Sequence, residues 1–395
     1  MANTRSLVAV VAGSLVTTCQ IAAQVAEEGG WQPIEVPHQR AAMAPEITAT
    51  PHGTALTWLE ATSEDRRPTY ALMAAPYRDG GFAQPMAVAE DRRMFANWAD
   101  FPSALCAEDG RILAHWLRRG GRGQYGVVLA EREPDGEAFV ELGHPHSGGI
   151  QGEHGFVSML PEGDSIRLFW LDGRNFETQR LMELRTALVK GGKVEAEEVL
   201  DPDVCTCCQT SATMADSGPV VVYRGRDQGE IRDIKIVCQR DGRWTAPVTI
   251  ADDGWVMPGC PVNGPAIAAN GEQLAVAWYT AAKSGAGVKV AFSADGGQTF
   301  APPQWVDRNE PLGRVDITRD GSGFAITWLG KVADQAVVCV QDWTPEKPPG
   351  TVFKVDEVAP TRTTGFPRLT TTPEGTLLVW KAGDDLRAAL RKTSR

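Results

Sequence analysis

The sequence predicts an all-β fold, a seven-bladed β-propeller with four-stranded antiparallel blades. A pattern recurs along the chain: a short strand follows Pro or Gly, a turn comes next, and a second strand ends in an aromatic residue. These aromatic residues lie roughly 50 to 58 residues apart, which is the range of propeller blades. No long stretch has helical periodicity. The aromatic positions are Trp58, Trp116, Trp170, Tyr223, Trp278, Trp328 and Trp380.

The copies of the pattern follow one another without a long interruption. Further strand-like runs lie between them, as in 288–292 and 304–306, so each copy supplies four strands. The last copy is short, and the run 31–36 ahead of the first copy can provide its missing outer strand. That pairing would join the two ends of the ring and remove an open sheet edge. A six-bladed ring with one spurious copy is the alternative. The copies begin at Ala44, Phe101, Gly155, Gln209, Gly264, Gly313 and Phe366.

Residues 1–24 have the pattern of a secretory signal peptide. Arg5 gives a positive start, an apolar run covers 7–16, and 21–24 is a plausible cleavage zone. We therefore expect a periplasmic or secreted protein whose residues 31–395 form a single propeller domain. Lipid attachment at Cys19 is an alternative, although Thr18 is unusual before a lipidated cysteine. No other stretch is long and apolar enough to cross a membrane, so none is expected in the mature chain.

Composition narrows the choice of partners. The 395 residues are 43% hydrophobic, enough for a large core, and the formal net charge is −11. Such a charge argues against nucleic acid or an anionic membrane surface as the main partner. The chain has 8 cysteines, and after signal cleavage an odd number remains in a compartment that permits disulfides. At least one thiol is therefore expected to stay free or to bind a ligand.

A dense group of thiols is the main candidate site. Cys205, Cys207 and Cys208 precede the inner strand of the fourth copy, and Cys260 precedes that of the fifth. Neighbouring blades bring such loops together at one rim. A disulfide between adjacent cysteines is strained and cross-links almost none of the chain, whereas close thiolates suit a soft metal ion. Copper as Cu(I) is the expected metal and zinc the alternative.

Other readings of the thiols stay open. His154 and Met257 are candidates to complete the metal site. A disulfide from Cys260 to one of the other three cysteines would link the two blades instead. A redox-active dithiol is the third interpretation.

The run from 293 to 300 carries a family resemblance. Its Ser-x-Asp-x-Gly-x-Thr-Phe pattern resembles the Asp-box of the sialidase-like (BNR repeat) propellers, with structural roles at Ser293, Asp295, Gly297, Thr299 and Phe300. The chain is also similar to an exported bacterial group of such propellers with a Cys-x-Cys-Cys run and a Gly-Cys-Pro element. The resemblance implies the propeller fold and leaves the function open, because the box occurs in enzymes and non-enzymes alike.

The resemblance also implies a set of glycosidase residues to test. Sialidases hold a carboxylate with three arginines and use a Tyr nucleophile, assisted by Glu, and an Asp acid. The early Arg-Ile-Pro signature of those enzymes is missing, since residues 39–45 read Gln-Arg-Ala-Ala-Met-Ala-Pro. Tyr223 also occupies the repeated aromatic position, where a packing role competes with a catalytic one. The candidate catalytic residues are Asp100, Tyr223, Arg224, Arg314 and Arg368.

Three functions follow as hypotheses. The first is an exported propeller with a thiolate-rich copper site, for metal handling or metal-dependent redox chemistry. The second is an exo-sialidase-like glycoside hydrolase or glycan-binding protein. The third is an envelope protein-interaction scaffold with disulfide-bonded cysteines. The expected partner is a metal ion or a small anionic ligand, with another envelope protein under the third hypothesis, and whether the protein is an enzyme stays open.

Overall fold

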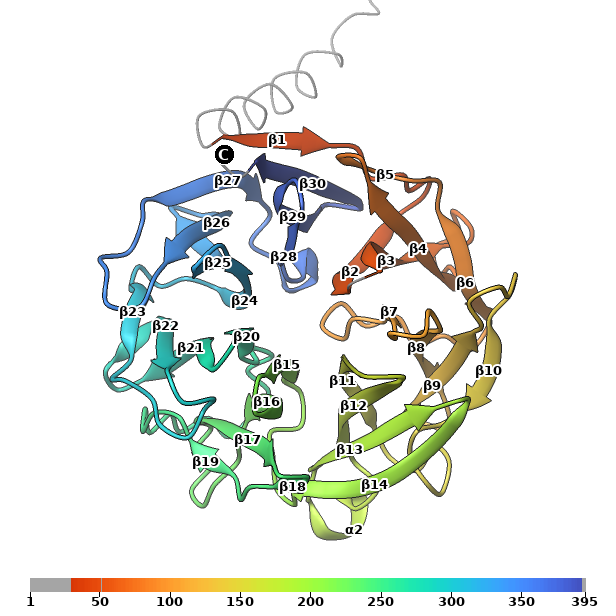
Figure 1. Cartoon of the computed structure of the whole chain (residues 1–395), viewed down its shortest axis with the longest axis horizontal. Coiled ribbons are helices and arrows are strands. Elements are labelled where there is room, and N and C mark those ends of the chain that lie inside the picture. Colours follow the sequence, from red (N-terminus) through yellow and green to blue (C-terminus); the bar gives the residue numbers. More distant parts are fainter. Residues whose placement is uncertain (1–29, 51, 393–395) are drawn as a thin grey trace, which may run out of the picture.

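The computed structural model describes residues 30–50 and 52–392. Seven antiparallel sheets stand around a central axis (Figure 1). The predicted seven-bladed propeller is therefore confirmed, and the six-bladed alternative is wrong. The expected signal peptide, 1–24, and Cys19 lie outside the described residues.

The strands follow the chain from the inner to the outer edge of each blade. Blade 1 contains β2 (Ala42–Thr50), β3 (Gly53–Ala61), β4 (Tyr70–Arg78), β5 (Gly81–Phe82) and β6 (Met86–Asp91). Blade 2 contains β7 (Ala104–Cys106), β8 (Ile112–Arg119), β9 (Tyr125–Arg132) and β10 (Val140–Gly143). Blade 3 contains β11 (His154–Glu162), β12 (Ser165–Asp172), β13 (Glu183–Lys190) and β14 (Lys193–Asp201), with the short helix α2 (Phe176–Gln179) between β12 and β13.

The second half of the ring repeats this plan. Blade 4 contains β15 (Ser211–Ala215), β16 (Gly218–Arg224), β17 (Ile234–Arg240), β18 (Arg243–Trp244) and β19 (Val248–Thr249). Blade 5 contains β20 (Ala266–Asn270), β21 (Gln273–Ala282), β22 (Gly285–Ser293) and β23 (Gln304–Asp307). Blade 6 contains β24 (Gly313–Asp320), β25 (Gly323–Val332), β26 (Gln335–Trp343) and β27 (Val352–Val358). Blade 7 contains β28 (Arg368–Thr372), β29 (Gly375–Ala382), β30 (Asp385–Lys392) and β1 (Trp31–Ile34), after the 3₁₀ turn η1 (Arg362–Thr364).

The ring closes where the two ends of the described chain meet. β1 is the outer strand of blade 7 and pairs antiparallel with β30, from Trp31 opposite Arg391 to Ile34 opposite Ala388. Trp31 is fully buried among residues of blades 6 and 7. The predicted closing strand is thus confirmed, and it covers the edge that β30 would otherwise expose.

The repeated aromatic residues hold neighbouring blades together. All of them are buried, and each donates an N–H or O–H hydrogen bond to a carboxylate. In five blades the acceptor comes from the outer edge of the preceding blade, so the bond crosses the interface as well as satisfying a buried polar atom. The pairs are Trp58–Glu60, Trp116–Asp91, Trp170–Asp172, Tyr223–Asp201, Trp278–Asp253, Trp328–Asp307 and Trp380–Asp356.

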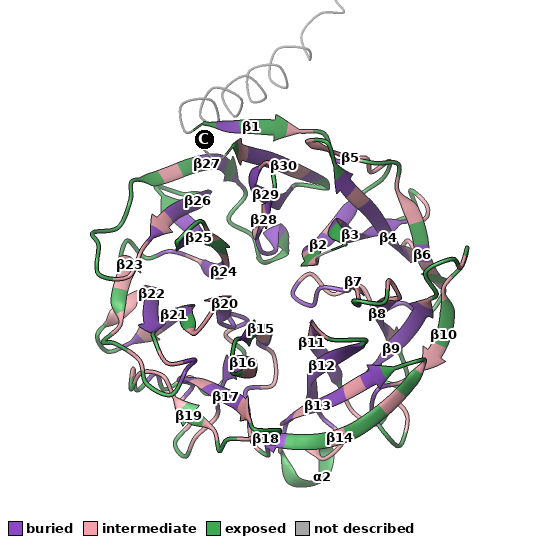
Figure 2. Cartoon of the chain, viewed as in Figure 1, coloured by how far each residue is buried: buried purple, intermediate pink, exposed green. Residues whose placement is uncertain are grey.

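Two blades depart from the simple four-strand plan because their outer strand is split in two. Pro85 lies between β5 and β6, and Pro247 lies between β18 and β19. Proline has no N–H to donate to the ladder, so the pairing breaks there and resumes further along. Burial is highest in middle strands such as β12, while outer strands such as β14 are more exposed (Figure 2). Within the described residues, no helix is long and apolar enough to cross a membrane.

One face of the ring carries the loops that lead into the inner strands, and we call it the thiol face. The turn from Ser293 to Phe300, between β22 and β23, lies on the opposite face. There Ser293 Oγ accepts the Gly297 N–H at 2.9 Å, and Asp295 Oδ1 accepts the Thr299 N–H at 2.9 Å. The Thr299 hydroxyl donates to Asp295 Oδ2 at 2.6 Å, so the turn satisfies its own polar groups.

Candidate functional site

The thiol loop, residues 204–208, is fixed by backbone bonds to the blades on either side. The Val204 N–H donates to the Met182 carbonyl at 2.8 Å, and the Cys205 N–H donates to the Arg224 carbonyl at 3.0 Å. Val204 itself is fully buried. The loop is therefore clamped between blades 3 and 4 before the chain enters β15.

Three sulfur atoms gather in this loop. The Sγ atoms of Cys205, Cys207 and Cys208 all lie within 4.8 Å of one another, and Cys205 Sγ is 3.5 Å from Cys208 Sγ. A disulfide needs about 2.05 Å between its sulfurs, and the seven cysteines in the described part of the chain are free thiols. Two thiolates on one ion, each ~2.3 Å from the metal, can be at most ~4.6 Å apart. The three sulfurs, all within 4.8 Å of one another, are close to that limit.

Cys260 comes from the next blade and contacts this group at one member, because its thiol hydrogen-bonds with that of Cys207. Its Sγ is 3.7 Å from the Thr206 hydroxyl, and its side chain is exposed. The lack of a side chain at Gly264 lets the two loops approach closely, because a Cβ there would come 2.1 Å from the Gln209 carbonyl oxygen. We expected Cys260 to lie close to at least two of the other three sulfurs. The three cysteines of one loop converge, and Cys260 hydrogen-bonds with one of them, Cys207.

The thiols differ in acidity. Hydrogen bonding with Cys207, and then with Cys208, lowers the pKa of Cys205 well below the ordinary thiol value. Hydrogen bonding with Cys207 lowers the pKa of Cys260 to about 6. Burial raises the pKa of Cys208 to about 12, and its Sγ accepts the Asn263 N–H at 3.4 Å. The site therefore mixes thiolates with thiols whose protons a metal would have to displace.

The two residues proposed to complete the metal site, His154 and Met257, lie in different places. His154 is fully buried: Nε2 is 2.8 Å from the Gln151 carbonyl, and Nδ1 is 3.1 Å from Asp172 Oδ2. Its ring stacks on His146 at 3.9 Å between centroids. His154 is thus engaged within blade 3 and is not part of the thiol group. Met257 lines a pocket on the thiol face together with Cys260.

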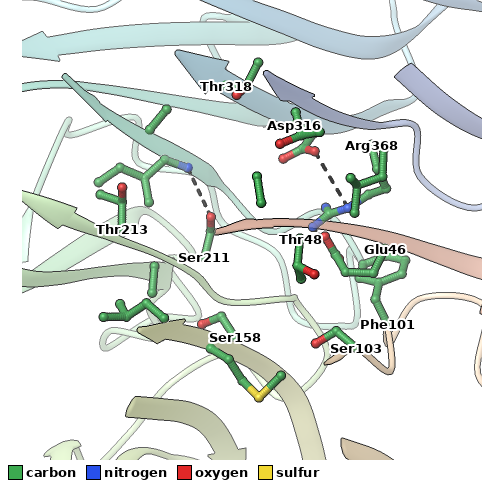
Figure 3. Close-up of a pocket in the computed structure, with 18 of the residues that line it drawn as sticks. Glu46, Thr48, Phe101, Ser103, Ser158, Ser211, Thr213, Asp316, Thr318 and Arg368 are labelled. Carbon is green, nitrogen blue, oxygen red and sulfur yellow. Dashed lines mark hydrogen bonds and ion pairs between the residues drawn. The ribbon is translucent and has the colours of Figure 1, made fainter. Parts of the chain in front are cut away.

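The inner strands form a layered channel below the thiol face. A cavity of about 360 Å³ runs along it, and side chains two residues apart on each strand face inward, as the pleat requires. Figure 3 shows Glu46, Ser158, Asp316 and Arg368 in this channel, each from a different blade. In blades 1, 3 and 6 a register shift precedes the channel residue. The sequence predicted the inner strands but did not indicate which of their side chains line the channel.

The channel charges are paired. Arg368 Nη2 lies 2.5 Å from Glu46 Oε2, and Arg368 Nε lies 3.7 Å from Asp316 Oδ2. Burial, only partly offset by Arg368, raises the pKa of Glu46 to about 7. Burial also raises the pKa of Asp316. One guanidinium therefore serves two carboxyl groups, and Arg368 has no charge to spare for a ligand. The sequence did contain a sign that Glu46 lines the channel: it follows Pro45 in its repeat, just as Arg368 follows Pro367.

Asp100 is buried at the start of blade 2. Its Oδ2 accepts the Phe156 N–H at 2.6 Å, and burial raises its pKa to about 7. Gly155 is required beside it, since a Cβ there would come 2.3 Å from Asp100 Oδ2. Tyr125, which the sequence reasoning missed, lies nearby and donates to Glu153 at 3.4 Å.

The structure does not bring the sialidase set together. Tyr223 is fully buried and its hydroxyl donates to Asp201 at 2.7 Å, the packing role of the repeat. Arg224 is buried over Trp255, where it donates to backbone carbonyls including that of Asn263. Arg314 lines the pocket beside Cys260, and Arg368 lines the channel cavity. The three arginines thus face different surroundings, without a shared carboxylate position.

Comparisons with known proteins agree on the architecture. No protein-family model matches the chain, and no curated protein matches it. Among solved structures, an ulvan lyase of polysaccharide lyase family PL25 is 12% identical with a TM-score of 0.56, covering 91% of this chain and 96% of that one. A protein of unknown function from Dyadobacter fermentans is 13% identical with a TM-score of 0.48, covering 81% and 96%.

A sialidase is also among the similar structures. The Hadza microbial sialidase Hz136 is 14% identical with a TM-score of 0.44, covering 74% of this chain and 64% of its own. Identities this low show a shared fold and no shared chemistry. The chain therefore shares its fold with the ulvan lyase.

Proposed function

We propose that this protein is an exported propeller that binds a soft metal ion, with copper as Cu(I) first, through Cys205, Cys207 and Cys208. The observation that carries the proposal is the convergence of three free sulfurs within 4.8 Å in a loop clamped by both neighbouring blades. Thiolate ligands select Cu(I) and Zn(II). Structural zinc sites almost always have four protein ligands, and the thiol loop itself provides three, so copper comes first and zinc is the alternative. Cys260 stands next to the site as an accessible thiol through which metal can enter or leave.

Metal stoichiometry on the reduced protein tests this proposal. Full-length protein is purified under reducing conditions, supplied with Cu(I) or Zn(II), dialysed and analysed for metal and free thiol. We expect about one equivalent of copper per chain, with uptake falling as pH drops because protons compete for the thiolates. The double variant Cys207→Ser/Cys260→Ser should lose the metal and stay folded.

A matched control and the contrary result complete this experiment. Cys106→Ser changes a half-buried thiol on β7, outside the cluster, and should leave uptake intact. Less than about a tenth of an equivalent of either metal, with thiols missing from the count, would mean that the cysteines form disulfides. That outcome supports the scaffold function in place of the metal function.

A carbohydrate-directed activity is the second candidate. What supports it is the pair of carboxyl groups lining the channel cavity, Glu46 and Asp100, whose pKa values burial raises to about 7, the range of a general acid. The ulvan lyase and the sialidase of similar fold make glycans the substrate class to try. Release of sugar from a fluorogenic sialoside or from a uronate-containing polysaccharide would establish it, provided that Asp100→Asn abolishes the release. No release from either substrate would remove this candidate.

A further inference from the structure

A second pocket on the thiol face has a distinct chemistry. Its volume is about 320 Å³, and it opens beside Cys260. Trp98, Trp255 and Tyr279 contribute aromatic surface, while Arg314 and Arg362 contribute positive charge. A protein whose net charge is −11 therefore concentrates two cations, and no acidic residue, in the lining of this cavity.

Arg314 occupies a position where other blades bury apolar side chains. It lies at the register shift of β24, with φ at 58° and 6% of its surface exposed. The corresponding shifts in blades 1 and 3 place Ala44 and Phe156 there, with φ of 52° and 55°. Both belong to the hydrophobic cluster at this end of the channel. A guanidinium among such residues is costly to bury, so its presence calls for a compensating partner.

The described residues do not supply a carboxylate to that guanidinium. Arg314 Nη1 donates to the carbonyls of Thr361 and Gly365, each at 3.1 Å, and neither Arg314 nor Arg362 forms an ion pair there. Both guanidiniums lie over the Trp98 ring, 4.9 and 5.7 Å from its centroid. Burial, and then repulsion from Arg362, lowers the pKa of Arg314 to about 10. Arg368 in the channel, by contrast, has two carboxyl partners.

We propose that this pocket binds a small organic carboxylate, whose anionic group pairs with Arg314 and Arg362 and whose apolar body lies against Trp255 and Tyr279. Bidentate pairing of guanidinium with carboxylate is among the strongest charge-assisted contacts in proteins. The site is not the three-arginine arrangement of a sialidase, because Arg224 and Arg368 face other partners. It also goes beyond metal binding, since the ligand contacts no member of the three-thiol group.

Asn263 connects the pocket to the thiols. Its backbone N–H donates to Cys208 Sγ at 3.4 Å, and its side-chain Oδ1 accepts the backbone N–H of Arg314 at 2.7 Å. Asn263 therefore contacts both the thiol loop and the backbone of Arg314. The two sites share a wall, and each can be occupied alone.

Titration calorimetry with a matched pair of probes tests the pocket. The probes are anthranilate, an aromatic carboxylate, and anthranilamide, its neutral analogue, added to full-length metal-free protein. We expect anthranilate to bind with a Kd below about 1 mM and anthranilamide to bind about tenfold more weakly or not at all. Arg362→Glu, a change of an exposed residue without an ion pair, should weaken anthranilate about tenfold.

The controls separate this pocket from the metal site. Arg308 is also exposed and lies over a tryptophan ring, Trp305, 4.8 Å from its centroid, and it is not among the residues that line the pocket. Arg308→Glu should leave anthranilate binding within about twofold of the wild type. Cys207→Ser should bind anthranilate normally, and Arg362→Glu should take up metal normally. Equal binding of the two probes, equal losses in Arg362→Glu and Arg308→Glu, or no saturation by about 10 mM would overturn the proposal without bearing on the thiols.

Discussion

Two polar loops on opposite faces of the ring show how differently this chain uses reactive side chains. In the turn from Ser293 to Phe300, the side chains of Ser293, Asp295 and Thr299 bond to one another and to the turn backbone. In the thiol loop, backbone bonds fix the chain, while the sulfurs of Cys205 and Cys208 face each other. The polar groups of the first loop satisfy one another with hydrogen bonds. The second keeps its ligand atoms available.

The difference separates a structural loop from a chemical one. Both loops are short and rich in groups that bind ligands in other proteins. What distinguishes them is whether the groups are already satisfied, and this can be read only from the hydrogen bonds. The same rule sorts the buried arginines, since Arg368 is neutralised by Glu46 and Asp316 while Arg314 has only carbonyl partners.

The largest effect is expected from the ring itself, which both loops depend on. Trp31→Ala removes a fully buried side chain from the closing strand and should lower the free energy of unfolding by about 3–5 kcal/mol. Trp305→Ala, at a half-buried site on β23, should cost clearly less. Chemical denaturation of both variants measures the difference. Equal costs would show that β1 does not close the ring, and loop defects could not then be told from fold defects.

A pH-dependent effect of intermediate size is expected from Asp100 on the thiol face. Burial raises its pKa from 3.8 to about 7, so the folded chain holds this proton more tightly than the unfolded chain. Stability should therefore fall as pH rises from about 4 to about 7, by at most ~1.4 kcal/mol per pH unit from this group. Asp100→Asn should remove that part of the slope, and the exposed control Asp252→Asn should not. Parallel stability curves for the wild type and Asp100→Asn would contradict the buried carboxyl.

The smallest effect is expected from the self-satisfied turn. Asp295→Ala should lower the free energy of unfolding by about 1 kcal/mol, because its hydrogen bonds to Thr299 and Ser293 are lost. Metal uptake and anthranilate binding should stay at wild-type levels. Asp334→Ala, in the exposed turn between β25 and β26, is the control and should be nearly neutral. If Asp295→Ala folds but fails to take up metal, the turn is not purely structural, and the distinction between a structural loop and a chemical loop is wrong.

The sequence was sufficient for the architecture because the repeat places one aromatic residue at the same point of every blade. Spacing and periodicity identify such a feature without any knowledge of contacts. The partners of those residues were not predictable, since carboxylates such as Asp91 and Asp307 lie on the preceding blade at varying separations. These carboxylate partners can be identified only once it is known how one sheet packs against the next.

The candidate site was predictable only in its local part. Three cysteines in four residues must lie close together, and they do. Cys260 comes from another blade, and its approach depends on how the two blades pack, which no sequence pattern specifies; its Sγ contacts Thr206 and Cys207. The arginines were harder still. Arg314 lies at a register shift, two residues before the inward-facing Asp316, and it lines the pocket beside Cys260. Arg368 itself faces inward and lines the channel cavity. The two arginines therefore enter different cavities although they occupy similar places in their repeats.

Ring closure by β1 has a mechanical consequence. The four residue pairs from Trp31–Arg391 to Ile34–Ala388 hold β1 to β30, and no hairpin joins the two strands. In the other blades the outer strand follows its sheet neighbour directly along the chain, so a detached strand stays next to its place. Under a force that pulls the two ends apart, β1 is expected to detach first from β30, and because β1 leads directly into β2, the ring then opens between blade 7 and blade 1. The thiol loop, held between blades 3 and 4, lies on the far side of that opening and keeps its geometry.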